Sequence, residues 1–493
     1  MNVVGDGSAR CATVRSSNTL IVGSQPNLNR TPTNGTGQIF VSNGGAIILE
    51  QDPANPTSST IITAAGHNDV NGLENFEAEI VVTGENSEIV ADFVSVGAPV
   101  NGATGQIQVL DGASLTAAIT RDFGGGLRNT GSVQLGEGSE LIVDGANSSV
   151  DTNRLVAGFG PNTRDQTSNP GNAATQVTVS NGGRITAGSD NQGALVGYGS
   201  RANMLVTGTG SQFVVTALPS DDTDPANLGD EGDLIVGLTT PLYVPATDSY
   251  QFIEGAGSLT VTDNATVTVA DDVRIGDTDT YFRGIIEDFY PGISVPSSSG
   301  MVEVSNGGQL TATRVIVGEN GTLGGDGGTI NADVVLDGGT VAPGMSPGVL
   351  DIFGDFTILG GALDIEISGS LLGQYDILNI SGDLFANNPF DINISFLDGF
   401  MPSEGDAFDF LNVTGETSSL TALFENSLIG FNIFGFSDEF SLGFDLADGR
   451  FSATAFSEPV NPSPVPVPAS LPILIAGLSG LGILRRYRRK QSI

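Results

Sequence analysis

The chain has 493 residues and a formal net charge of −38, although only 15% of its residues are charged. Its one lysine, Lys490, lies beside Arg485, Arg486, Arg488 and Arg489 near the C-terminal end, so the body that precedes them is strongly acidic. Such a body repels nucleic acid phosphates and anionic lipid headgroups, which argues against nucleic acid as a partner.

The composition predicts an all-β protein. Gly accounts for 69 residues and Trp for none, and Gly, Asn, Asp, Ser and Thr alternate with β-branched residues. This pattern is typical of many short strands that are joined by tight turns. Because Cys11 is the only cysteine, no internal disulfide is available, and strand pairing must supply the stability.

Short apolar segments that end in glycine recur through the first two thirds of the chain. The last five end at intervals of 39 to 42 residues, at Gly158, Gly197, Gly237, Gly276 and Gly318. Between the turns apolar and polar residues alternate, which buries one set of side chains and exposes the other. A regular period of this length predicts a solenoid over residues 1–348.

Two turn phrases alternate between these segments. Val-Ser-Asn-Gly-Gly occurs at Val41 to Gly45, Val179 to Gly183 and Val304 to Gly308, and Val-x-Gly-x-x-Ser occurs at Val82 to Ser87, Val143 to Ser148 and Val206 to Ser211. We therefore expect the ~40-residue period to divide into two half-units of about 20 residues, each one coil of three short strands. An array of β-sandwiches is the competing fold, since hairpins also favour Asn-Gly turns.

Four insertions interrupt the period, at Pro161 to Pro170, Pro219 to Asp230, Pro241 to Tyr250 and Asp277 to Ser299. In a solenoid such insertions become loops on one face, often the face that binds. One acidic run consists of Asp221, Asp222, Asp224, Asp230, Glu231 and Asp233. Neither an EF-hand loop nor an RTX nonapeptide is present, so we expect a solvated loop and no cofactor, with Ca²⁺ as the one ion that the run could hold.

The sequence offers no obvious catalytic constellation. His67 is the only histidine, so neither a Ser/His/Asp triad nor a histidine pair for a metal can be assembled. We therefore expect a protein that is not an enzyme. The alternative is a polysaccharide-degrading β-helix enzyme that uses paired carboxylates, because the fold alone does not exclude catalysis.

The repeat phrases resemble those of autotransporter passenger domains and related bacterial β-helix adhesins. Gly339 to Gly348 is similar to the phrase GGTLAPGxSPG that often closes such regions, and Tyr375 to Ile380 resembles the strand YDQLNV that commonly follows them. The resemblance implies a right-handed parallel β-helix. Residues 349–457 are rich in Phe and are predicted to form a C-terminal β cap that seals the stack. We also expect that coils and a signal peptide precede Met1.

The last 36 residues have three parts. Residues 458–469 form a Pro-rich linker that ends in Val465, Pro466, Val467, Pro468 and Ala469, residues 470–484 form an apolar segment, and residues 485–493 are basic. The apolar segment predicts one short transmembrane helix, held with its basic end in the cytoplasm.

This order of motif, apolar helix and arginine-rich end resembles the PEP-CTERM class of sorting signals, in its VPLPA variant. The resemblance implies export, a transient inner-membrane anchor and processing by an exosortase-type protease. The expected function is that of a structural or adhesin-like protein of a Gram-negative cell surface or extracellular matrix. An exopolysaccharide or cell-surface ligand is its expected partner.

Overall fold

A computed structural model describes residues 2–4, 13–17, 19–22, 35–50, 59–64, 76–97, 104–118, 120–122, 127–129, 131–160, 173–189, 193–217, 232–244, 249–276, 298–344, 347–435, 440–447 and 449–457. Cys11, His67, most of the acidic run and residues 458–493 lie outside them. None of the described residues forms a helix with the length and apolar character that a membrane crossing needs.

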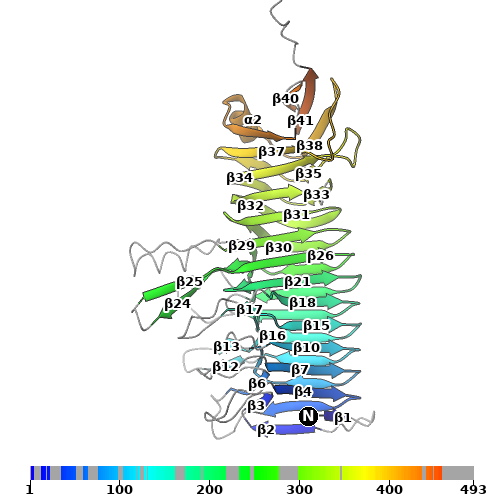
Figure 1. The fold of residues 1–493 in the computed structure, drawn as a ribbon, viewed down its shortest axis with the longest axis vertical. Coiled ribbons are helices and arrows are strands. Elements are labelled where there is room, and N and C mark those ends of the chain that lie inside the picture. Colours follow the sequence, from blue (N-terminus) through cyan, green and yellow to red (C-terminus); the bar gives the residue numbers. More distant parts are fainter. Residues whose placement is uncertain are drawn as a thin grey trace, which may run out of the picture.

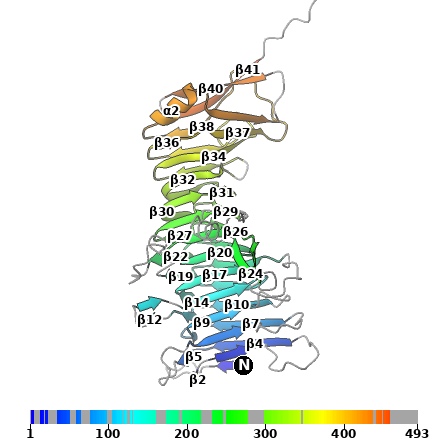
Figure 2. The same ribbon diagram turned by 90° about the vertical axis from the view of Figure 1, so that its left-hand side faces the viewer.

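The chain winds into an elongated stack of coils, and nearly every described element is a strand (Figure 1). Successive coils pair in parallel, residue against residue, so each strand lies beside its counterpart one coil away. The parallel β solenoid predicted from the repeats is therefore confirmed. Figure 2 shows the same unbroken stack from the side, with α2 (Ser418–Glu425) at the end remote from the N-terminus.

Each regular coil contributes one strand to each of three parallel faces, in the order face 1, face 2, face 3. Face 1 consists of β1 (Asn2–Val4), β4 (Gly35–Ser42), β7 (Phe76–Thr83), β10 (Thr104–Leu110), β15 (Glu140–Asp144), β18 (Thr175–Ser180), β21 (Arg201–Thr207), β26 (Ala256–Thr262), β29 (Ser299–Val304), β31 (Gly321–Gly325), β37 (Phe390–Phe396) and β39 (Ile429–Phe434).

Face 2 consists of β2 (Thr13–Ser17), β5 (Ala46–Glu50), β8 (Glu88–Val90), β11 (Ser114–Ala117), β16 (Ser149–Thr152), β19 (Arg184–Ser189), β22 (Gln212–Ala217), β27 (Thr266–Val269), β33 (Val349–Ile352), β35 (Ile377–Ile380) and β38 (Ala407–Val413). Face 3 consists of β3 (Thr19–Val22), β6 (Ile61–Ala64), β9 (Phe93–Val96), β14 (Ser132–Gly136), β17 (Arg154–Phe159), β20 (Ala194–Tyr198), β23 (Leu234–Leu238), β28 (Asp272–Ile275) and β36 (Leu384–Ala386).

Three longer strands bend from one face into the next: β30 (Gln309–Val317), β32 (Gly328–Pro343) and β34 (Phe356–Ile367). The stack continues through these strands. β32, which precedes residue 348, pairs in parallel with both β33 and β34, which follow it. Only at the far end does the pairing change. There β41 (Arg450–Ser457) adds antiparallel to β38, and β40 (Phe440–Ala447) adds antiparallel to β41.

The core follows from alternation along each strand. On β10 every second residue points inward, and Ile107 and Val109 are fully buried while their neighbours stay partly exposed. Stacking repeats this in every coil, so aliphatic side chains form continuous ladders along the axis. Burying each such side chain contributes about 1.5–3 kcal/mol relative to leaving it exposed. The largest fully buried side chain in the middle of the rod is Phe213.

The two turn phrases form the same corner, between face 1 and face 2, in different coils. In Val-Ser-Asn-Gly-Gly, Asn43 and Gly44 both have positive φ, 52° and 77°, and the Gly45 N–H donates to the Ser42 carbonyl at 2.9 Å. Asn and Gly are the residues that tolerate this pair of conformations. The last member of the phrase is Gly because a Cβ at Gly183, which is equivalent to Gly45, would lie 2.4 Å from the Val143 carbonyl oxygen.

The serine of Val-x-Gly-x-x-Ser ties one coil to the coil before it. The hydroxyl of Ser87 accepts the N–H of Gly44 at 3.0 Å, and Ser148 and Ser211 do the same for Gly112 and Gly182. The alternation of two phrases therefore has a physical reason. One coil presents a turn with a backbone donor to satisfy, and the next coil supplies the acceptor.

The predicted coil length was wrong over most of the rod. The glycines spaced by 39 to 42 residues stand one coil apart, because the strands that contain or directly precede them are neighbours in the order β17, β20, β23, β28 and β30. Steps of about 20 residues occur where few residues are inserted, as between β14 and β17 and from β29 through β31 to β32. The ~40-residue period appears because the steps on face 3 from β17 to β30 are nearly equal, and each of them is one turn of the solenoid and not two.

As far as β29, the segments that lengthen the coils begin or end at face 3, and the corner between faces 1 and 2 stays tight; nearer the C-terminal end, residues 368–376 and 397–406 join face 1 to face 2. Two of the segments at face 3 contain antiparallel hairpins: β12 (Thr120–Asp122) with β13 (Leu127–Asn129), and β24 (Thr240–Val244) with β25 (Ser249–Ile253). Both project from the same side of the rod in Figure 1. The insertion at Pro241 to Tyr250 is thus largely a hairpin, whereas Pro161 to Pro170 and Pro219 to Asp230 lie outside the described residues.

The far end of the rod is filled by aromatic rings. α2 follows the position of β36 on face 3 and places Phe424 against Phe451, with ring centroids 5.2 Å apart. Phe431 of β39 stacks on Phe444 of β40 at 3.8 Å. These rings occupy the place that aliphatic ladders occupy elsewhere, which accounts for the Phe-rich composition of this region.

Candidate functional site

A groove on face 1 is the concave feature that we consider as a candidate site. Its volume is about 450 Å³, and it lies where β4, β7, β10 and β15 begin. The lining residues are Gly37, Gln38, Glu77, Ala78, Glu79, Thr104, Gly105, Gln106, Gly138 and Glu140. Three carboxylates and two amides are present among these ten residues, and no lysine or arginine.

The polar side chains of the groove belong to one ladder along the rod. Gln38, Glu79, Gln106 and Glu140 occupy the same register position on four successive strands, and Gln176 continues the ladder on β18. They alternate between amide and carboxylate, so each carboxylate has an amide beside it. Strand pairing fixes their spacing at about 4.8 Å along the axis.

The ladder is held by its own hydrogen bonds. The Nε2 of Gln38 donates to the Oε2 of Glu79 at 2.6 Å, and the Nε2 of Gln106 donates to the Oε2 of Glu140. Gln108, two residues farther along β10, donates to the Oε1 of Gln106. A carboxylate has about four lone-pair positions, so one amide bond orients it and leaves capacity to accept further hydrogen bonds.

Small residues precede three of the ladder positions. Gly37, Ala78 and Gly105 lie in register, each one residue before a ladder residue. A Cβ on Gly105 would point into the core, 2.1 Å from the Cγ1 of the buried Val96, so a larger residue does not fit there. Sequence reasoning did not find this groove. The signal was available, since Gln38, Glu79, Gln106 and Glu140 each stand three residues before a buried valine.

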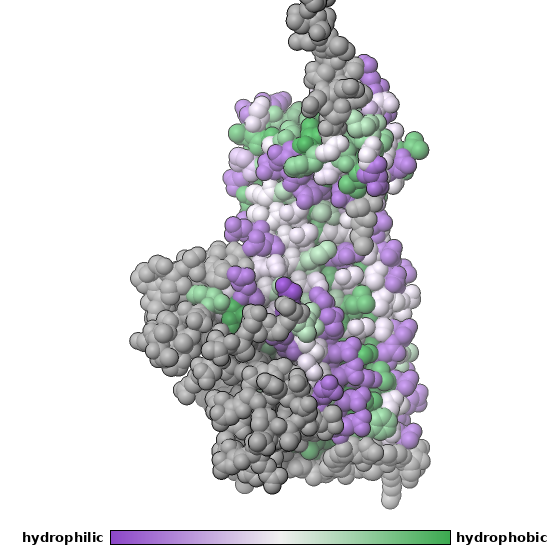
Figure 3. Space-filling view, viewed as in Figure 1, coloured by the Kyte–Doolittle hydropathy of each residue, from purple (hydrophilic) through white to green (hydrophobic). Residues whose placement is uncertain are grey.

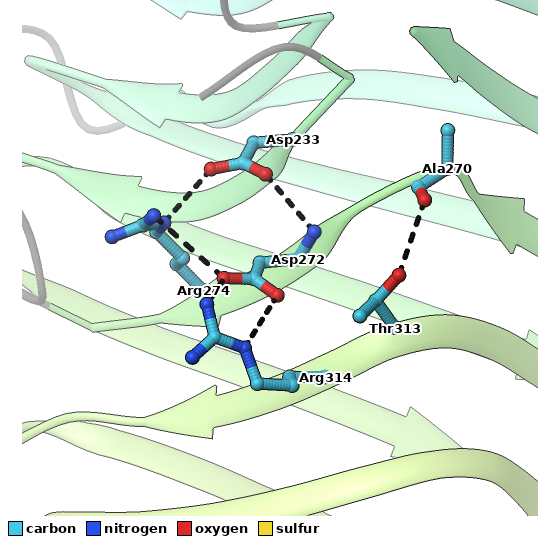
Figure 4. Close-up of polar contacts among 6 residues, drawn as sticks. All are labelled: Asp233, Ala270, Asp272, Arg274, Thr313 and Arg314. Carbon is cyan, nitrogen blue, oxygen red and sulfur yellow. Dashed lines mark hydrogen bonds and ion pairs between the residues drawn. The ribbon is translucent and has the colours of Figure 1, made fainter. Parts of the chain in front are cut away.

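A second group of charges lies on face 3 (Figure 4). Asp233, which directly precedes β23, and Asp272 of β28 are fully buried and adjacent. The Nε of Arg274 lies 2.9 Å from the Oδ2 of Asp233. Arg314 contacts both oxygens of Asp272, at 3.0 and 2.6 Å. Asp233 also accepts the backbone N–H of Asp272 at 2.9 Å, so this bond and the contacts of Arg314 together link three successive coils.

These contacts decide whether the carboxylates of this group are available to a metal ion such as Ca²⁺. Carboxylate oxygens of Asp233, Asp271 and Asp272 lie within 4.8 Å of one another, and Ca²⁺ takes six to eight oxygen ligands. The guanidinium groups of Arg274 and Arg314 already occupy Asp233 and Asp272. Burial raises the pKa of the Asp233 carboxyl to about 6, against the opposing effects of the Asp272 N–H and Arg274. The group is best described as an ion-paired link between coils.

Several other acidic side chains accept hydrogen bonds from backbone N–H groups. Asp333 accepts the N–H of Asp355 at 2.9 Å, Asp355 accepts that of Asp383 at 2.8 Å, and Asp383 accepts that of Glu416 at 2.8 Å. Each carboxylate thus caps the start of the next coil. Part of the large negative charge is therefore structural, and it need not mark a binding site.

Asp376 has the same role where the turn after Pro343 enters the next coil. Its Oδ1 accepts the N–H of Gly348 and its Oδ2 accepts that of Glu366, each at 2.7 Å. Only 1% of the residue is exposed. Burial raises the pKa of this carboxyl to about 7, and the two N–H donors oppose that rise. The last residue of the phrase Gly339 to Gly348 is thus fixed by the buried carboxylate of Asp376, which accepts its N–H.

The sorting residues predicted from the sequence are not tested by these contacts. The motif Val465 to Ala469 and the basic residues Arg485 to Lys490 lie outside the described part of the chain, as do Asp221, Asp222, Asp224, Asp230 and Glu231 of the acidic run. Of that run, the structure describes only Asp233. Neither a scan of protein-family models nor a search of curated proteins returns a match to this chain.

Proposed function

We propose that the chain is a secreted structural or adhesin-like protein of a bacterial cell surface or extracellular matrix, and that it is not an enzyme. The observation that carries the proposal is the unbroken parallel stack, which builds each face from strands paired coil after coil into one extended surface. Solenoids use such extended surfaces to bind other polymers and proteins. The groove on face 1 supplies a place for an exopolysaccharide or another cell-surface ligand.

Delivery to the surface is assigned to the C-terminal tail. In this proposal residues 470–484 anchor the exported chain in the inner membrane, the basic residues 485–493 stay in the cytoplasm, and an exosortase-type protease acts near Val465 to Ala469. The processed rod, wound with the right hand usual for parallel β-helices, then reaches the outer surface or the matrix. Support comes from the order of motif, apolar segment and basic end in the sequence.

Localisation tests the proposal directly. A chain that lacks residues 465–493 should leave the surface fraction and accumulate in the periplasm or medium, as measured by fractionation and surface immunolabelling. Pro466→Ala with Pro468→Ala, within the motif, should have the same effect. Pro462→Ala with Pro464→Ala changes the linker equally but spares the motif, and it should leave the location unchanged. Unaltered surface location of the truncated chain would refute the sorting role.

One observation favours the catalytic alternative enough to test it. Glu79 and Glu140 stand two strand spacings apart on the same ladder, roughly 10 Å between backbones, and inverting glycosidases hold their carboxyl groups roughly 6.5–9.5 Å apart. Release of reducing ends from neutral, acidic and amino polysaccharides decides between the functions. Turnover that disappears in Glu79→Gln or Glu140→Gln would replace the structural role by an enzymatic one.

A further inference from the structure

We propose that Asn43 and Asn181 are deamidation sites, and that a serine of the following coil keeps both of them latent. Each residue stands first in an Asn-Gly pair at the corner between face 1 and face 2, and each has a positive φ of 52°. The inference concerns a chemical modification of the rod and does not depend on the proposed surface function. Water is the only reactant that the modification needs.

The reaction begins when the backbone nitrogen of the glycine attacks the side-chain carbonyl carbon, Cγ, of the asparagine. A new N–C bond closes a five-membered succinimide ring, the bond from Cγ to Nδ2 breaks, and the departing nitrogen takes up the N–H proton and leaves as ammonia. Water then adds to either carbonyl of the ring and opens it, which gives aspartate or isoaspartate. Glycine favours the first step, because it has no Cβ to hinder the approach to Cγ.

Hydrogen bonds to the next coil hold the attacking nitrogen in place. The N–H of Gly44 donates to the hydroxyl of Ser87, and the N–H of Gly182 donates to the hydroxyl of Ser211, each at 3.0 Å. Ring closure requires that the nitrogen give up this proton and turn toward Cγ. Neither ring can therefore close until the corner opens locally and the hydrogen bond to the serine breaks.

The asparagine side chains themselves are open to water. Asn43 and Asn181 are exposed, whereas Gly44 is buried and Gly182 is half-buried. Hydrophilic side chains are frequent along the edge of the rod at which the strands of face 1 end, on the right of Figure 3. Water for hydrolysis is thus at hand, and the position of the glycine nitrogen limits the rate of the modification.

A third Asn-Gly turn at the same corner is held in another way. The N–H of Gly307, which follows Asn306, donates to the backbone carbonyl of Gly327 at 2.8 Å, so no side-chain substitution removes its acceptor. This turn is therefore an internal reference for the two that depend on serine. Serine or alanine follows the other asparagines with positive φ, and their Cβ atoms hinder the attack: Asn86, Asn147 and Asn264.

Deamidation of Asn181 should also weaken the corner in which it occurs. The Nδ2 of Asn181 donates to the Oδ1 of Asp144 at 2.6 Å. The product has no such donor and places a second carboxylate beside Asp144, and like charges at this distance repel. Isoaspartate adds a methylene to the backbone of a tight turn as well. The modification is thus one that the folded corner resists and that, once made, opposes closure of the corner.

Peptide mapping by mass spectrometry of the full chain, aged in mild detergent at mildly alkaline pH, tests the proposal. Asn43 and Asn181 should deamidate far more slowly in the folded chain than in the same chain unfolded in urea. Ser211→Ala should accelerate the deamidation of Asn181 about tenfold, because loss of the acceptor makes opening of the corner easier. Ser87→Ala should do the same for Asn43. The rate at Asn306 should not change in either variant.

A matched variant separates the hydrogen bond from the loss of a hydroxyl as such. Ser149 is half-buried at the start of β16. Ser149→Ala should leave all three rates unchanged. The proposal is overturned if Asn181 deamidates as fast in the folded chain as in the unfolded one, if Ser211→Ala leaves its rate unchanged, or if Ser211→Ala accelerates Asn181 and Asn306 equally. The comparison of folded and unfolded chains needs no variant, so it decides even where a variant fails to fold.

Discussion

Replacing Asp376 with asparagine should change how the stability of the C-terminal coils depends on pH. The carboxylate is buried and accepts two backbone hydrogen bonds of 2.7 Å, from Gly348 and Glu366. Burial raises its pKa from 3.8 to about 7. Because the folded state binds this proton more tightly than the unfolded state, the proton stabilises the fold. That contribution is complete below pH 3.8 and is lost as the pH rises toward 7.

The size of the effect follows from the shift. Each pKa unit corresponds to 1.36 kcal/mol, so raising the pH from 4.5 to 8 should remove up to about 3 kcal/mol of the free energy of unfolding. Asparagine carries no proton to lose and supplies one acceptor where the carboxyl supplies two. The variant should therefore lose about 1–3 kcal/mol for one unsatisfied N–H at every pH, without the additional loss between pH 4.5 and 8.

Urea denaturation at pH 4.5 and pH 8, followed by circular dichroism, measures both quantities. Hydrogen exchange of peptides that contain Gly348 and Glu366, corrected for intrinsic rates, reports on the same coils locally. The expected result is that Asp376→Asn destabilises the protein more at pH 4.5 than at pH 8, by up to about 3 kcal/mol. An equal destabilisation at both values would show that the carboxyl titrates normally and would refute the reasoning.

Three further predictions concern the body of the rod. Phe213→Ala removes a fully buried ring and should lower the free energy of unfolding by about 3–5 kcal/mol, whereas Val214→Ala on the outward side of the same strand should change it by less than about 1 kcal/mol, as urea denaturation will show. Arg314→Ala should cost about 1–3 kcal/mol, because the buried Asp272 loses its closest cation; an unchanged midpoint would contradict the assigned ion pair. Addition of EDTA should leave the melting temperature unchanged, because Arg274 and Arg314 occupy the carboxylates of Asp233 and Asp272; a clear decrease would indicate bound Ca²⁺.

The parallel solenoid could be predicted because its causes are local. Alternating apolar residues and turns such as Asn43-Gly44 appear directly in the sequence, and each turn needs the left-handed conformations that Asn and Gly supply. The length of a coil could not be predicted in this way. It depends on how many residues are inserted between successive strands, and the sequence does not distinguish one long coil from two short ones.

Contacts between coils could not be predicted from the sequence for a related reason. Asp272 and Arg314 are 42 residues apart and meet only because β28 and β30 pair in one particular register. The ladder of Gln38, Glu79, Gln106 and Glu140 was hidden by insertions that make its spacing uneven. An alignment of the strands on their buried valines would have revealed it. The roles of the tail, from Val465 to Lys490, remain predictions from the sequence.

The measurement that tests the account most directly is a set of distances between spin labels on face 1 of a chain in which Cys11 is replaced by serine. Glu79 and Met301 are six strand pairings apart on the same ladder, so their separation should be about 29 Å although they are 222 positions apart in the sequence. A pair at Glu79 and Ser258, five pairings apart, should give about 24 Å. A narrow distribution that lengthens by one strand spacing per coil is the predicted result. Broad distributions, or distances that do not increase with the number of coils, would contradict a continuous parallel stack.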